Sequence, residues 1–163
     1  MTNLVSLLLA ERAHSAIWGA ALNEMRIKRD LPPRIASRDV GTAADGDSHH
    51  AAQCATNMAI FGIPLVLPGD SISIVQHDRQ TVIDVIEAER TFAIRWWTAL
   101  NDLRRNDQMP GWVLNLSVGH EPDMDQWREK TSAVNFALFD TDYVRESTTT
   151  ARAAAPRLKE MLT

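Results

Sequence analysis

The sequence has little cysteine and tyrosine and no long apolar run. Its one cysteine, Cys54, excludes an internal disulfide, a CxxC redox pair and a zinc site built on several thiolates. No stretch approaches the roughly 18–20 uninterrupted apolar residues that a membrane-spanning helix needs. The apolar run Leu4–Ala10 is short and has no basic leader before it, unlike a secretory signal. We therefore expect a cytoplasmic protein without a membrane partner.

Neither sign of charge is in large excess. Seventeen Lys and Arg stand against twenty-one Asp and Glu, and the net charge of −4 argues against nucleic acid as a partner. The sequence also lacks a Gly-rich phosphate loop, a nucleophile elbow and a Cys–His signature. No repeat, low-complexity tract or long linker is evident. With 45% apolar residues, the chain is expected to form a single helical domain over residues 1–163.

Hydrophobic periodicity and helix punctuation predict a mainly α fold. Apolar residues recur at spacings of three and four along the first 28 residues, and Pro32 and Pro33 follow. Asp78 is the expected N-cap of the longest helix, because more than twenty residues without Gly or Pro come after it. We expect a bundle of about five helices, over Leu4–Lys28, His49–Phe61 (capped by Asp47 or Ser48), Arg79–Arg105, Asp123–Leu138 (opened by a capping box of Asp123 and Gln126) and Thr141–Leu162, the last interrupted by Pro156.

Two short segments alternate polar and apolar residues, which is typical of half-buried strands. They are Ser71–Val75 and Trp112–Val118. Two isolated strands are marginal unless helices cover them. The sequence therefore predicts a small two-stranded β element packed on the bundle.

Two acidic residues fall on apolar helix faces. At 100° per residue, Glu89 lies near the middle of the apolar face of Arg79–Arg105, and Glu11 lies at the centre of the apolar face of the first helix, with His14 beside it. A carboxylate that folding removes from water must be protonated, paired with a cation or bound to a metal. Burial of both residues predicts a cationic partner for each of them.

One interpretation is a shared metal site. Glu11 and His14 stand three residues apart, Asp47 and His50 repeat that spacing, and Glu89 comes from a third helix. Carboxylate-x-x-His pairs completed by a further Glu assemble the ligands of di-iron and di-manganese bundles. The candidate ligands, Glu11, His14, Asp47, His50 and Glu89, would suit Fe, Mn or Zn and an enzyme that oxidises or hydrolyses a small molecule.

The alternative interpretation needs no metal. Each carboxylate pairs with an arginine, such as Arg12, Arg90 or Arg95, or sits at a solvated rim. General acid–base chemistry without a metal is the third reading of the same two carboxylates.

The first helix carries a second apolar band on its back, and two tryptophans stand beside polar turns. The tryptophans are Trp112 and Trp127, which we expect to be semi-exposed, and tryptophan is enriched at interfaces. The band consists of Val5, Leu9, Ala16, Ala20 and Ile27. We therefore predict a soluble helical interaction or assembly protein that forms a homo-oligomer, with the metal-dependent enzyme as the alternative. A small-molecule ligand is compatible with either.

Overall fold

The computed structural model describes residues 3–75, 78–113 and 117–141, and the fold is mainly helical, as predicted. Within these residues there are five α-helices and one short 3-10 helix. They are α1 (Leu4–Ile27), α2 (Pro33–Ala36), α3 (Ala43–Phe61), α4 (Arg79–Arg105), η1 (Gly111–Val113) and α5 (Glu121–Phe139).

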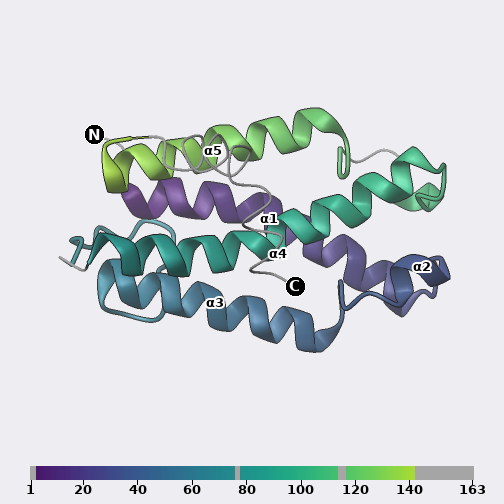
Figure 1. Cartoon of the computed structure of the whole chain (residues 1–163), viewed down its shortest axis with the longest axis horizontal. Coiled ribbons are helices and arrows are strands. Elements are labelled where there is room, and N and C mark those ends of the chain that lie inside the picture. Colours follow the sequence, from purple (N-terminus) through teal and green to yellow (C-terminus); the bar gives the residue numbers. More distant parts are fainter. Residues whose placement is uncertain (1–2, 76–77, 114–116, 142–163) are drawn as a thin grey trace, which may run out of the picture.

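The four long helices lie side by side in the order α5, α1, α4, α3 (Figure 1). The central helices, α1 and α4, pack on each other, while α5 packs on α1 and α3 packs on α4. The short helix α2 lies at the end of the bundle where α3 begins (Figure 1). In the part of the chain that the structure describes, no helix is both long enough and apolar enough to cross a membrane.

The caps confirm one predicted helix start and correct another. The Asp78 carboxylate accepts a hydrogen bond from the Thr81 N–H at 3.1 Å and begins α4, as predicted. The prediction that α3 begins at His49 is wrong, because the helix starts at Ala43. The Thr42 hydroxyl accepts a hydrogen bond from the Asp45 N–H and caps the helix there, so residues 43–48 are part of the helix.

The start of α5 also differs from the prediction. The helix begins at Glu121, with Pro122 in its first turn, and not at a capping box of Asp123 and Gln126. The Asp123 carboxylate instead contacts side chains of α1, a tertiary contact that outweighs its local capping preference. Apart from its first residue, the helix predicted over Thr141–Leu162 lies outside the described residues.

The predicted β element is not seen in the described residues. Ser71–Val75 has no strand partner, and its alternation does not place one face in the core, since Ile74 is 51% exposed. The Val75 N–H bonds to the Ile60 carbonyl at the end of α3 instead. In the second segment, residues 111–113 form η1 and bury Val113, while residues 114–116 lie outside the described part of the chain.

The core consists of two apolar clusters separated by a polar layer. One cluster joins the C-terminal halves of α1 and α4 to the start of α5, around Trp18, Leu22 and Leu100. The other joins their N-terminal halves to the ends of α3 and α5, around Leu8 and Ile86. Between the clusters, α1 and α4 each place a Glu–Arg pair in the interior. The helical phase inferred from the sequence is therefore confirmed at both carboxylates.

The chain contains an internal repeat, contrary to the expectation of none. Residues 4–62 match residues 82–140, each residue corresponding to the one 78 positions later. Both halves run through a long helix, a short helical turn and a 19-residue helix. Identical residues recur where a side chain is buried or bonded, as in the pairs Glu11/Glu89, Arg12/Arg90, Trp18/Trp96, Asn23/Asn101, Arg26/Arg104, Gly41/Gly119, Asp45/Asp123 and Asn57/Asn135.

The two halves repeat their hydrogen bonds as well as their residues. Asn23 Nδ2 donates to the Gly41 carbonyl at 2.9 Å, and Asn101 Nδ2 donates to the Gly119 carbonyl at the same distance. Both glycines are left-handed, with φ of 78° and 83°. A side chain at either would also meet the backbone of the preceding long helix. These shared bonds fix the long helix, the connecting loop and the second helix of each half in the same geometry.

Candidate functional site

The two buried carboxylates are held by arginines across the interface of α1 and α4. Arg90 donates from Nε to Glu11 Oε2 at 3.1 Å and from Nη2 to Oε1 at 2.7 Å. Arg12 donates in the same bidentate way to Glu89, at 2.9 and 2.7 Å. All four side chains are at least nine-tenths buried. The ion-pair interpretation of both carboxylates is thereby confirmed.

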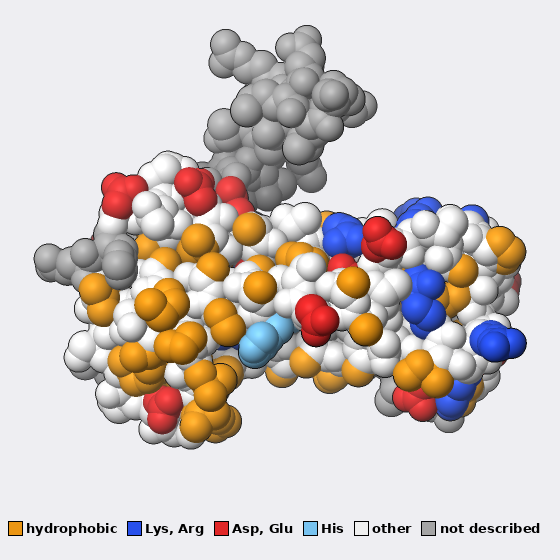
Figure 2. All heavy atoms as spheres, turned by 90° about the horizontal axis from the view of Figure 1, so that it is seen from below, with side chains coloured by type: hydrophobic (Ala, Val, Ile, Leu, Met, Phe, Trp, Pro, Cys, Tyr) orange, Lys and Arg blue, Asp and Glu red, His pale blue; other side chains and the backbone are white. Residues whose placement is uncertain are grey.

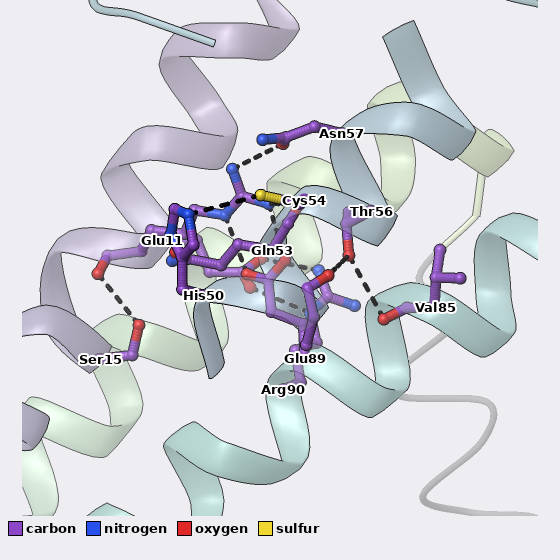
Figure 3. A network of polar contacts seen from close by, with 12 residues as sticks. Glu11, Ser15, His50, Gln53, Cys54, Thr56, Asn57, Val85, Glu89 and Arg90 are labelled. Atoms are coloured by element: carbon purple, nitrogen blue, oxygen red, sulfur yellow. Dashed lines mark hydrogen bonds and ion pairs between the residues drawn. The ribbon is translucent and has the colours of Figure 1, made fainter. Parts of the chain in front are cut away.

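The outer helices complete this layer, and Figure 3 shows its contacts with α3 from close by. Arg12 Nη1 donates to Asn57 Oδ1 at 2.8 Å, and Arg90 Nη1 donates to Asn135 Oδ1 at the same distance. Each Nη2 also donates to a main-chain carbonyl of the same outer helix, that of Gln53 at 3.3 Å or Thr131 at 3.4 Å. Each arginine therefore ties three helices together. With the charges paired and each guanidinium making four hydrogen bonds, the layer fits a role in specifying how the helices pack.

The structure does not bring the five candidate metal ligands together. Glu11 and Glu89 face the two arginines, whereas His14 turns toward α5. Asp47 and His50 are exposed on α3, where the His50 ring lies 3.6 Å from the sulfur of Cys54. Across residues 3–75, 78–113 and 117–141, no group of three or more His, Cys, Asp or Glu side chains is arranged to hold a metal ion. The metal site therefore stays a prediction, and no group of potential ligands among the described residues supports it.

His14 belongs to a chain of polar contacts between α1 and α5. Its Nδ1 lies 3.0 Å from Asp123 Oδ1, and its Nε2 lies 3.0 Å from the Lys130 ammonium, which has only donors to offer. The neutral ring therefore carries its hydrogen on Nδ1 and accepts at Nε2. Trp18 Nε1 donates to the other Asp123 oxygen at 2.5 Å. This arrangement orients His14 and fastens α5 to α1.

Asp45 makes the equivalent contacts in the first half of the chain. Its Oδ2 accepts from Trp96 Nε1 at 2.6 Å and from the Gly41 N–H at 3.1 Å, and Arg95 lies 3.3 Å from Oδ1. Sequence reasoning missed both this carboxylate and Asp123. The available signal was their shared place in the repeat, four residues after a glycine that precedes the second long helix of each half.

His49 lacks the partners that His14 has. Its ring packs edge-on against Trp96, with centroids 4.6 Å apart, and against Phe92 at 5.5 Å. The residue is 9% exposed, and its Nε2 is buried without a hydrogen-bond partner. Burial lowers the pKa of His49 below its usual value of 6.5; nearby Arg12 and His50 lower it further, while Glu89 and Asp45 oppose the shift. The imidazole is therefore neutral at neutral pH.

Burial of a neutral His49 predicts a loss of stability in acid. The unfolded chain protonates this residue below about pH 6.5 and the folded chain does not, so the free energy of unfolding falls as the pH drops through that value. The slope from one such group is at most about 1.4 kcal/mol per pH unit. Urea denaturation at pH 7.5 and pH 5 measures it. His49→Phe keeps a ring against Trp96 and is expected to lose less stability on acidification; an equal loss in both proteins would assign the acid sensitivity to other groups.

A cavity of about 340 Å³ adjoins His49, between α1 and α3 and over Trp96. Most side chains around it are small or uncharged: Ser15, Ala16, Gly19, Ala20, Asn23, Gly41, Thr42, Ala43, Gly46, His49, Gln53 and Trp96. A second hollow, of about 330 Å³, shares Ala16 and Gln53 with it and continues toward Leu65. Together they form a groove along α1 and α3.

The comparisons with known proteins add no relative. No family model, no curated protein and no solved structure matches the chain.

Proposed function

We propose that this protein is a helical interaction protein that associates with a second copy of itself through one apolar surface. The surface, here named the apolar end, consists of Met58, Ile63, Leu65 and Leu67. Its leucines are 60% and 53% exposed. In Figure 2 apolar side chains gather over the end of the molecule where α3 finishes, while basic side chains gather at the opposite end. Exposed apolar groups that cluster in this way are typical of interaction sites.

The loop that carries the apolar end is held in place. Between its two exposed leucines, Val66 is buried in the core. Asn57 Nδ2 donates to the Pro64 carbonyl at 2.8 Å, and the Leu67 N–H donates to Asp70 at 2.8 Å. A surface that is already ordered loses little conformational entropy on binding. The fixed loop therefore supports a role in docking.

A second copy of the chain is the partner that this chemistry favours. The segment 62–69 contains no charged residue, although the chain as a whole carries a net charge of −4. In a two-fold symmetric dimer the same patch meets itself, so an uncharged patch brings no like charges together. The tryptophans offered less support than expected. Trp127 is buried in the core, which corrects the prediction that it is semi-exposed. Trp112 is 39% exposed and donates to Asp30, just beyond the end of α1.

The double substitution Leu65→Glu and Leu67→Glu tests this proposal. Each leucine contributes about 1.5–3 kcal/mol when it is buried, so the variant is expected to weaken self-association by at least about 100-fold. Light scattering at about 50 μM should give a dimer for the natural chain and a monomer for the variant. The matched control is Ile27→Glu, since Ile27 is 73% exposed and lies outside the apolar end. A monomeric natural chain, or a variant that remains dimeric, would contradict the proposal.

The contacts of the two buried carboxylates do not favour the metal-dependent enzyme. Its ligand set needs Glu11 and Glu89 to be free for a metal, and each carboxylate accepts two hydrogen bonds from an arginine.

A further inference from the structure

The two halves of the repeat differ in the size of several side chains around the cavity beside His49. Here the first half has Gly19, Gly46 and Ala16, where the second half has Trp97, Met124 and Ile94. The hydrogen bonds that define the repeat are unchanged on both sides. The cavity therefore results from small residues at particular positions of a common framework. The corresponding side chains of the second half therefore indicate what kind of group could fill the cavity.

Trp97 is the side chain that the first half lacks. It is partly buried against the core, and its indole Nε1 donates to the His120 carbonyl at 3.4 Å. The corresponding positions in the first half are Gly19, which offers no side chain, and Thr42, which lines the cavity. The Thr42 carbonyl accepts one bond, from the Gly46 N–H at 3.1 Å, and a carbonyl oxygen can accept two.

His49 is the second observation that points to a ligand. Its counterpart in the second half is Trp127, so the first half has a polar ring where the other half has an apolar one. A buried polar atom without a hydrogen-bond partner destabilises the folded state, and Nε2 of His49 is such an atom in a ring that lines the cavity. The side chains around the cavity carry no formal charge, because the imidazole is neutral.

We infer that the cavity binds an uncharged, planar heteroaromatic molecule about the size of an indole. The ring takes the place that the Trp97 indole has in the second half. Its N–H donates to the Thr42 carbonyl, and a second ring nitrogen or a polar substituent of the ligand hydrogen-bonds to His49. A volume of about 340 Å³ is in the range of small-ligand pockets. No charged side chain lines the cavity, which favours a neutral ligand over an anion or a cation.

Indole is the probe for the test, and isothermal titration calorimetry is the measurement. We expect saturable binding at one site with a Kd below about 1 mM. Gly46→Met introduces the residue that fills the corresponding space in the second half, and a Cβ at Gly46 meets nothing within 4 Å. This variant is expected to fold and to weaken indole binding by at least tenfold. The control is Gly111→Met, another open position, outside the cavity, and it should bind indole as the natural chain does.

Two further measurements separate a specific site from loose apolar adsorption. Indole-3-carboxylate, which carries a negative charge, is expected to bind at least tenfold more weakly than indole. His49→Phe keeps an apolar ring but removes both nitrogens. It is expected to weaken binding of indazole, which has an acceptor nitrogen beside its N–H, more than binding of indole, while the protein remains folded by circular dichroism. The inference is overturned if indole does not bind, if Gly46→Met binds it as tightly as the Gly111→Met control, or if the charged analogue binds as well as indole.

Discussion

Arg90→Met is expected to lower the free energy of unfolding by about 3–5 kcal/mol, because it leaves the Glu11 carboxylate buried without its cation. Glu11 is 2% exposed and accepts two side-chain hydrogen bonds from Arg90. Methionine keeps much of the volume of the arginine stem, so the loss measures the charge more than the packing. Urea denaturation at pH 7, followed by circular dichroism, gives the difference.

The matched control removes both charges together. Glu11→Leu combined with Arg90→Met is expected to recover most of the lost stability, because no buried charge remains. The internal repeat adds a second test of the same physics, since Arg12→Met leaves Glu89 in the same position and should cost a similar amount. If the double variant is as unstable as Arg90→Met alone, lost packing and the lost hydrogen bond from Arg90 to Asn135, not an unpaired charge, explain the effect.

Helical periodicity predicted the burial of Glu11 and Glu89 but not the identity of their partners. Which residues share one face of a helix depends on local sequence alone. A helical-wheel projection of Arg79–Arg105 therefore places Glu89 on the buried face without any information about the other helices. Its partner comes from another helix, 77 residues away, and is the arginine that follows Glu11 in the chain. Which arginine reaches which carboxylate depends on how α1 and α4 pack, and that information is not local.

The internal repeat was missed because few residues are identical in the two halves. Ala10-Glu11-Arg12 recurs as Ala88-Glu89-Arg90, and the Val-Gly pair that ends at Gly41 recurs at Gly119, both at a spacing of 78. Between these matches the exposed positions have diverged, since solvated side chains constrain the fold little. A comparison of the sequence with itself at a fixed offset would have found the signal.

The cavity could not be predicted from the sequence for a different reason. Gly19 and Gly46 are ordinary small residues in helices, and neither indicates a hollow by itself. They indicate a hollow only when the repeat aligns the two halves and shows that Trp97 and Met124 occupy the corresponding positions. His49 was interpreted as a residue at the head of a helix, whereas α3 begins six residues earlier and places it against Trp96.

Gly41→Ala is the second substitution with a large expected effect, a loss of about 2–5 kcal/mol. Gly41 has a φ of 78°, and an added Cβ would lie 2.8 Å from both the backbone carbon and the Cβ of Leu22. The left-handed conformation costs an L-residue about 1–2 kcal/mol. Forcing extra atoms into a packed interior costs about 1–3 kcal/mol more. The loop that ends at Gly41 lies against the backbone of α1 and cannot move away without giving up the bond from Asn23.

Three other glycines distinguish the two causes of this stability loss, the left-handed conformation and the close contact with a helix. Gly69→Ala meets the same left-handed strain, at a φ of 87°, but no atom within 4 Å, and is expected to cost only about 1–2 kcal/mol. Gly46→Ala meets neither obstacle inside α3 and should stabilise the protein by about 0.5–1 kcal/mol. Gly119→Ala repeats both obstacles against the backbone of Leu100 and should match Gly41→Ala. Thermal or urea denaturation of the four variants is then expected to rank Gly46→Ala above Gly69→Ala, with the other two lowest and close together. If Gly119→Ala were tolerated while Gly41→Ala was not, the two halves would not share the close approach of loop and helix on which the comparison of their cavities rests.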